Sequence, residues 1–156
     1  MFYGENTISK NGCELIAVYN VLTIKGKEIE FSDVINKAEN TDDVMWLFGY
    51  FGSRPEQLYK LFDAYNQEYR FTTNENYFNY YLEKDGVYVI SVYNGPTVTS
   101  GIHTVAFTCD SKKNIIVYNR YSDATSPYIY SSVGDKTGLD LFLEENGKSI
   151  ILYKVE

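Results

Sequence analysis

Apolar residues recur at the spacing of an amphipathic helix through the first half of the chain. The clearest run predicts a buried helix over residues 12–23, and Gly26 after it is typical of a helix exit. Asn11 is a suitable N-cap, and Glu14 follows at the spacing of a capping box. Further helices are expected at 32–39, with Ser32 as the cap, and at 44–48, 53–66 and 74–83, with a strand at 68–72.

From Gly86 onward the apolar positions change to the period of two that strands show. Strands are expected at residues 87–93, 102–109, 114–121 and 149–155, a last helix at 138–145, and a loop at 122–136. The polar turn 110–113 has hairpin length, so the strands on either side of it are predicted to pair antiparallel. Helices first and an antiparallel sheet afterwards predict an α+β fold, with all 156 residues in one domain.

The composition is that of a soluble globular domain with an excess of tyrosine. The 16 tyrosines suit strands and half-buried surfaces. The net charge is −7 and no basic patch is present, which argues against nucleic acid or an anionic membrane surface as a partner. The acidity fits either solubility or a cationic substrate.

The chain shows no membrane span or targeting segment. No apolar run approaches the ~20 residues that cross a bilayer. The first residues lack the basic start and the apolar region of a signal peptide. We therefore expect a soluble chain, either cytoplasmic or a domain of a longer exported protein. Its localisation and oligomeric state stay open.

Two cysteines are too few for a disulfide framework, although a Cys13–Cys109 pair stays open. Cys13 falls in the first turn of the helix predicted at 12–23, where unpaired N–H groups and the helix dipole favour a thiolate. It is therefore a candidate nucleophile. Cys109 follows a strand-like run and fits a small buried hydrophobe. One such cysteine and one histidine do not make a zinc site, so no metal or other cofactor is expected.

The only histidine, His103, lies in the strand predicted at 102–109. With a hairpin turn of about three to five residues, the register places Asn119 either opposite His103 or one diagonal away on the same face. An Asn carbonyl that accepts from one ring N–H would fix the tautomer and orient the other nitrogen, as a Cys–His–Asn site requires. Each residue alone also fits packing or turn chemistry, but the combination points to thiol chemistry.

Four short motifs follow one another along the chain. They are Asn11-Gly12-Cys13-Glu14, Gly52-Ser53-Arg54-Pro55, Gly101-Ile102-His103-Thr104-Val105 and Val117-Tyr118-Asn119. In this order and approximate spacing, the chain resembles the papain-like cysteine peptidases, especially the small bacterial branch that contains the bacteriocin leader-processing peptidases. The resemblance implies one papain-like domain over residues 1–156. In that fold, N-terminal helices pack on a C-terminal antiparallel sheet, with the active cleft between them.

Two departures from the family concern the site itself. The family usually has Cys-Gly-Pro, whereas Cys13 is followed by Glu14 and Leu15. The family also usually carries a glutamine about six residues before the cysteine, whose amide completes the oxyanion hole. That position is Thr7 here, and Asn6 is the nearest amide, with a shorter side chain. The resemblance therefore implies Asn6 as the substitute donor.

We therefore expect a cysteine peptidase, or a related thiol acyl-transfer hydrolase, that cuts a peptide or amide bond in a peptide or protein substrate. Cys13 would be the nucleophile, and His103 the general base and then the acid. Asn119 would orient His103, and Asn6 together with the Cys13 N–H would bind the oxyanion. The loop at 94–101 would form one wall of the cleft.

Two alternatives stay open. The fold could be a catalytically weak or inactive binding module, with a tyrosine-rich edge that binds peptide or sugar or simply packs on the sheet. The tyrosines of that edge are Tyr118, Tyr121, Tyr128 and Tyr130. A deamidase or transglutaminase-type effector would pass through the same thioester intermediate, so the sequence does not separate it from a peptidase.

Overall fold

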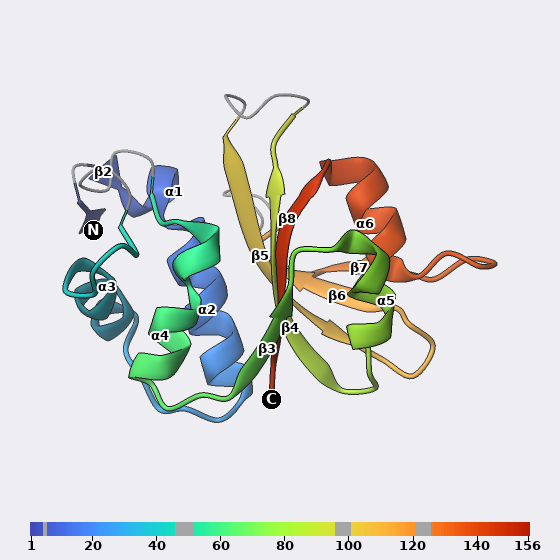
Figure 1. Ribbon diagram of the computed structural model, residues 1–156, viewed down its shortest axis with the longest axis horizontal. Helices are drawn as coiled ribbons and strands as arrows, with labels where there is room; N and C mark the ends of the chain where they lie inside the picture. The colour runs from blue at the N-terminus through green and yellow to red at the C-terminus, as the bar shows by residue number, and fades with distance from the viewer. Residues whose placement is uncertain (5, 46–51, 96–100, 121–125) are drawn as a thin grey trace.

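The computed structural model describes residues 1–4, 6–45, 52–95, 101–120 and 126–156, and its centre is one six-stranded antiparallel sheet (Figure 1). The strand order is β3-β8-β4-β5-β6-β7. In that order the strands are β3 (Tyr69–Thr72), β8 (Ser149–Val155), β4 (Gly86–Tyr93), β5 (Ile102–Cys109), β6 (Ile115–Tyr118) and β7 (Tyr128–Tyr130).

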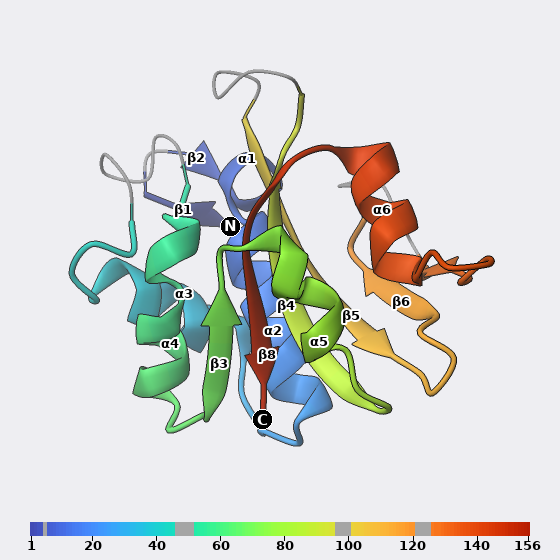
Figure 2. The same cartoon turned by 45° about the vertical axis from the view of Figure 1, so that its right-hand side comes forward.

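Helices lie on both sides of this sheet (Figures 1 and 2). On one side are α2 (Cys13–Ile24), α3 (Phe31–Glu39) and α4 (Tyr59–Ala64), and on the other are α5 (Phe78–Tyr81) and α6 (Gly138–Asn146). The shorter elements are β1 (Phe2–Tyr3), β2 (Asn6–Thr7), α1 (Ile8–Asn11) and the 3₁₀ turns η2 (Pro55–Gln57) and η3 (Glu75–Tyr77). Among the described residues, no helix has the length and apolar character needed to cross a membrane.

The central strands are apolar on both faces because each face has its own core. On β4, Val87 and Val89 pack in the core that contains the α2 side chains, whereas Tyr88 and Ile90 pack in the core that contains those of α6. Strands β5 and β8 divide their side chains between the two cores in the same way. The helix carrying Cys13 therefore lies directly on the sheet.

The expectation of a mixed fold with an antiparallel sheet is confirmed. The predicted helices and strands at 12–23, 138–145, 87–93, 102–109 and 149–155 are all present. Two features differ from the expectation. The sheet also includes β7, which lies in the stretch predicted to be a loop, and α5 and α6 cover the second face of the sheet. The helix expected at 44–48 falls mostly outside the described residues.

The predicted helix caps are wrong. The N-cap of α2 is Gly12, without a side-chain hydrogen bond, because Asn11 is the last residue of α1. The carboxyl of Glu14 is buried and bonded elsewhere, so it cannot complete a capping box. The N-cap of α3 is Glu30 rather than Ser32. The helices expected at 53–66 and 74–83 are shorter, each with a 3₁₀ turn before a short α-helix.

Burial of α2 is expected to dominate the stability of this half of the protein. Leu22 is fully buried on α2, whereas Ile24 at the end of the same helix is 41% exposed. Leu22→Ala removes buried apolar surface and leaves a cavity, so we expect a loss of about 2–5 kcal/mol in the free energy of unfolding. Ile24→Ala is the matched control, with an expected loss below about 1 kcal/mol. Urea denaturation measures both, and equal losses would contradict this assignment of the buried face.

Candidate functional site

Cys13 is the first residue of α2, and a sharp joint with α1 puts it there. The N–H of Gly12 donates to the Ile8 carbonyl at 2.8 Å, which closes α1 just before α2 begins. A Cβ at position 12 would lie 2.6 Å from that carbonyl oxygen, too close for any side chain. Glycine is therefore required directly before the nucleophile candidate.

The sulfur of Cys13 lies against the main chain of β5 on both sides of His103. Its Sγ is 4.0 Å from the Ile102 carbonyl oxygen. The main-chain N–H of Thr104 also points at the sulfur, and this contact lowers the Cys13 pKa. The fold thus brings the start of α2 to the one segment of the chain that contains a histidine. The described contacts of the sulfur are with the main chain of the two neighbours of His103, so a direct Cys13–His103 pair stays a prediction.

These β5 groups face Cys13 because β6 leaves the sheet early. The β5–β6 ladder ends at the pair Ala106–Tyr118, in the second of the two registers considered above. The next residue, Asn119, has φ +57°, a left-handed conformation that turns the chain out of the strand. The edge of β5 beyond Ala106 therefore lacks the β6 partner that an unbroken ladder would supply.

The alternation of main-chain groups along β5 then decides which of them face that edge. The Cys109 carbonyl accepts a hydrogen bond from Asp85, on the β4 side. Successive residues of a strand point their N–H and C=O groups to opposite sides, so Ile102 and Thr104 point away from β4. Their groups are the ones that meet the Cys13 sulfur.

His103 is held in one tautomer. Its Nε2 lies 2.5 Å from the Arg120 carbonyl oxygen. A carbonyl can only accept a hydrogen bond, so Nε2 carries the proton and Nδ1 is the basic nitrogen of the neutral ring. Burial lowers the pKa of His103 below its ordinary value, which favours this neutral form.

The Arg120 side chain is held by contacts with α6 and with Tyr128 of β7. Its guanidinium pairs with Glu145 of α6 and lies 4.0 Å from the ring centroid of Tyr128. The Arg120 side chain is largely buried, with 12% of its surface exposed. The carbonyl that fixes the His103 tautomer is therefore part of a well-packed segment.

The described hydrogen bond of the His103 ring differs from the one expected with Asn119, whereas the predicted role of Asn6 stays a prediction. Asn119 directly precedes Arg120, but the described ring bond of His103 goes to the Arg120 main chain rather than to the Asn119 side chain. Asn6 lies in β2, ahead of α1, and the described contacts of the Cys13 sulfur are with Glu14, Ile102 and the Thr104 N–H. Most of the predicted cleft wall at 94–101 lies outside the described residues.

Glu14 is the site residue that sequence reasoning missed. Its side chain is 3% exposed, and its Oε2 accepts a hydrogen bond from the Cys13 thiol at 3.3 Å. The main-chain N–H groups of Glu14 and Ser53 also donate to the carboxylate. Burial raises the Glu14 pKa to about 7. The signal was in the sequence, because an acidic residue stood at the start of an otherwise apolar helix.

Gly52 and Ser53, from the motif Gly52-Ser53-Arg54-Pro55, complete the wall around Glu14. A Cβ at Gly52 would lie 3.4 Å from the Glu14 carboxylate and 3.0 Å from the Asn11 carbonyl oxygen. The buried Ser53 hydroxyl bonds to the Tyr3 hydroxyl at 2.9 Å. Burial raises the pKa of Tyr3 to about 12, so this phenol stays neutral. Residues 52–53 thus pack directly on the start of α2.

Cys13 is a neutral thiol in this arrangement. Burial, and then the Glu14 carboxylate, raise its pKa well above the ordinary value of cysteine. This is opposite to the thiolate expected from the helix N-terminus. Cys13 and Cys109 are both free thiols, so they do not form the disulfide that the sequence left open. Within the described residues, no cluster of three or more His, Cys, Asp or Glu could hold a metal ion.

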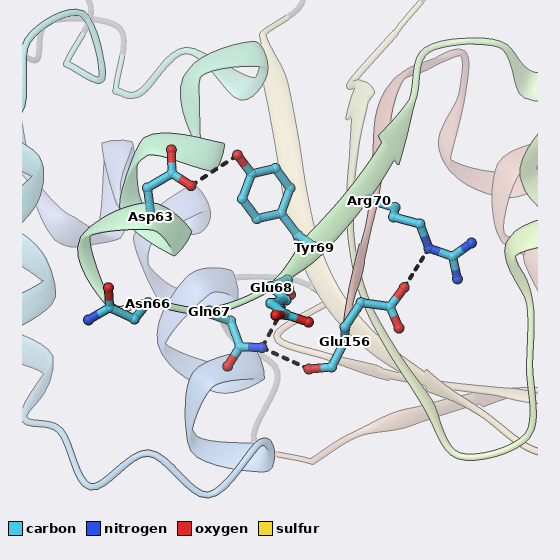
Figure 3. Close-up of a pocket in the computed structure, with 7 residues that line it drawn as sticks. All are labelled: Asp63, Asn66, Gln67, Glu68, Tyr69, Arg70 and Glu156. Atoms are coloured by element: carbon cyan, nitrogen blue, oxygen red, sulfur yellow. Dashed lines mark hydrogen bonds and ion pairs between the residues drawn. The ribbon is translucent and has the colours of Figure 1, made fainter.

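A separate hollow lies at the other end of the helical layer (Figure 3). It has a volume of about 680 Å³, and Lys27, just beyond α2, bonds to Tyr65 beside it. Its polar groups bond to one another: Tyr69 to Asp63, and Arg70 to Glu156. It holds none of the thiol chemistry described above.

The buried Glu14 carboxylate makes a testable contribution to stability. Its pKa is about 7 in the folded protein and about 4.3 in an unfolded chain, so the folded state holds the proton more tightly. The free energy of unfolding must then fall as pH rises from about 4 to about 7, relative to Glu14→Gln. We expect the variant to gain about 2–4 kcal/mol over the wild type between pH 4 and pH 8, measured by urea denaturation. A constant difference between the two proteins across this range would contradict the buried charge.

The chain matches no protein-family model and no curated protein sequence. The function must therefore be argued from the geometry of the site. In that geometry, Cys13 begins a buried helix, and the thiol bonds to the buried carboxylate of Glu14. His103 lies on the neighbouring strand β5 and is held in one tautomer.

Proposed function

We propose that the protein is a papain-like cysteine peptidase, or a related thiol acyl-transfer hydrolase, with Cys13 as the nucleophile. One observation carries the proposal. The Cys13 sulfur contacts the main chain on both sides of the only histidine, and that histidine is held with Nδ1 as its basic nitrogen. The resemblance of the four sequence motifs to that family supports the same assignment. The substrate would be a peptide or protein.

The chemistry starts from a neutral thiol and a neutral imidazole. His103 Nδ1 takes the thiol proton as Sγ attacks the carbonyl carbon of the scissile bond, forming a C–S bond. The C–N bond then breaks, and the leaving amine takes the proton from His103. Water hydrolyses the resulting thioester and regenerates the thiol. Catalytic hydrogen bonds are often longer in a substrate-free protein, so a direct Cys13–His103 bond is expected in the substrate complex.

The negative oxygen of the tetrahedral intermediate needs donors near Cys13. The first N–H groups of a helix have no partner within it, which suits the Cys13 N–H for this role. Asn6 is the proposed second donor, because β2 leads into α1 just ahead of the nucleophile. Asn119 supports His103 through the backbone turn that presents the Arg120 carbonyl.

The packing of the tyrosine-rich edge argues against the alternative of a non-catalytic binding module. Tyr130 is 5% exposed and packs at right angles on Phe142 of α6. Tyr118 packs against the core, and the half-exposed Tyr128 is covered by the Arg120 guanidinium. Tyr121 lies outside the described residues. These rings are used for internal packing. Transamidation or deamidation would use the same thioester with a different acceptor.

Alkylation of Cys13 by iodoacetamide tests the assignment of His103. At neutral pH the thiol reacts with the help of a base, so His103→Ala should slow alkylation at pH 7.5 by about tenfold or more. Acid should also slow the wild type, as protonation removes the basic Nδ1. Peptide mapping by mass spectrometry separates Cys13 from Cys109, and Cys13→Ser supplies the blank. Equal rates for wild type and His103→Ala would overturn the proposed pair.

Two substitutions at Asn119 separate its backbone role from a side-chain role. Asn119→Gly keeps the left-handed conformation, because glycine adopts positive φ without strain. We expect its Cys13 alkylation rate to stay within about threefold of the wild type. Asn119→Ala strains the turn by about 1 kcal/mol or more and should lower the rate further. If both variants lost the same large factor, the Asn119 amide itself would be the orienting group.

A further inference from the structure

Glu14 contacts the proposed nucleophile but takes no part in the proton transfers assigned to Cys13 and His103. Its carboxylate accepts the thiol hydrogen of Cys13 at 3.3 Å, and two main-chain N–H groups hold it in place. Gly52 packs against the same carboxylate oxygen, so the side chain has little room to move. The Cys13 sulfur is thus fixed between a carboxylate on its own helix and the main chain of β5.

Among the described residues, the groups that act on the Glu14 carboxylate are its own N–H, the Ser53 N–H and the Cys13 thiol, and none of the three carries a positive charge. The titratable groups near it are Cys13 on α2 and Tyr3 on β1, and Glu39 of α3 also acts on Tyr3. Tyr3 is neutral, and the main-chain N–H groups supply only partial charges. An ionised sulfur next to an ionised Glu14 would place two negative charges in contact inside the protein.

We infer that Glu14 is a positioning residue for the nucleophile: its carboxylate orients the thiol hydrogen and holds Cys13 neutral until the proton is removed. The inference rests on the proposed function, in which Cys13 is the nucleophile. In this inference Glu14, the residue that follows Cys13, determines whether the thiol is protonated in the resting site. When Glu14 carries a proton, its O–H can instead donate to the sulfur, and the like-charge penalty disappears. The charge of this one buried carboxyl group therefore controls how easily the Cys13 thiol ionises in the resting site.

The pH profile of Cys13 alkylation by iodoacetamide tests this inference. The wild-type profile should have an alkaline midpoint above the ~8.5 of an ordinary cysteine. Glu14→Gln keeps the shape of the side chain and removes its charge, so the midpoint should fall by at least one pH unit, a factor of about ten in thiolate population. A purely structural role of Glu14 would leave the midpoint where it is.

Glu39→Gln is the matched control. It removes one negative charge from an exposed residue of the same helical layer, and its midpoint should stay within about 0.2 of the wild type. Thermal unfolding confirms that each variant is folded at the assay temperature. If Glu14→Gln is not folded, the wild-type profile alone still decides, since a midpoint at or below ~8.5 would overturn the inference.

The same pH profiles distinguish a failure of this inference from a failure of the proposed function. The alkylation rate at neutral pH reports His103, whereas the alkaline midpoint reports Glu14. A midpoint that falls in Glu14→Gln while His103→Ala leaves the neutral rate unchanged would support the role of Glu14 and overturn the Cys13–His103 pair. The reverse result would keep the pair and overturn the role of Glu14.

Discussion

The burial of α2 against the central strands is the constraint on which the site depends. Leu15, Val18 and Leu22 are fully buried in the core shared with β4 and β5. Each side chain of this kind contributes roughly 1.5–3 kcal/mol when it is removed from water. The helix cannot slide along the sheet without exposing all three, so its first residue is fixed at the start of β5. Cys13 meets the main chain around His103 because the core leaves no other place for it.

Long regular elements were predictable because local pattern and tertiary packing agree there. The strands at 87–93 and 102–109 are buried on both faces, and their apolar runs show this directly. Caps and short helices were not predictable, because tertiary contacts compete for the same side chains. Glu14 satisfied the capping-box pattern, but its carboxylate bonds to the thiol and to Ser53 instead. Ser53 is the first residue of the helix predicted at 53–66, but its hydroxyl is buried against Tyr3.

The hairpin register brought Asn119 close to His103, and the observed pairing follows one of the two registers considered. The register alone could not show that the strand ends at Tyr118, because that depends on one backbone angle. Asn is among the few residues that adopt positive φ easily, so the sequence did carry this signal. The effect is that the main chain of Arg120, rather than the Asn119 amide, meets the ring. Burial of the Arg120 side chain against α6 and Tyr128 depends on the complete fold, so it lay beyond any local pattern.

Two electrostatic effects compete at Cys13, and their magnitudes decide its resting state. A helix N-terminus stabilises a negative charge by about 0.3–2 kcal/mol. A second unit charge about 3 Å away opposes it by about 5 kcal/mol, even at an effective dielectric constant of about 20. Desolvation of the buried sulfur acts in the same direction as this repulsion. The carboxylate therefore outweighs the dipole, and the site rests with a neutral thiol and a neutral imidazole. In the proposed reaction no ion pair is present beforehand, so the proton would leave the sulfur during the attack, with His103 as the proposed base.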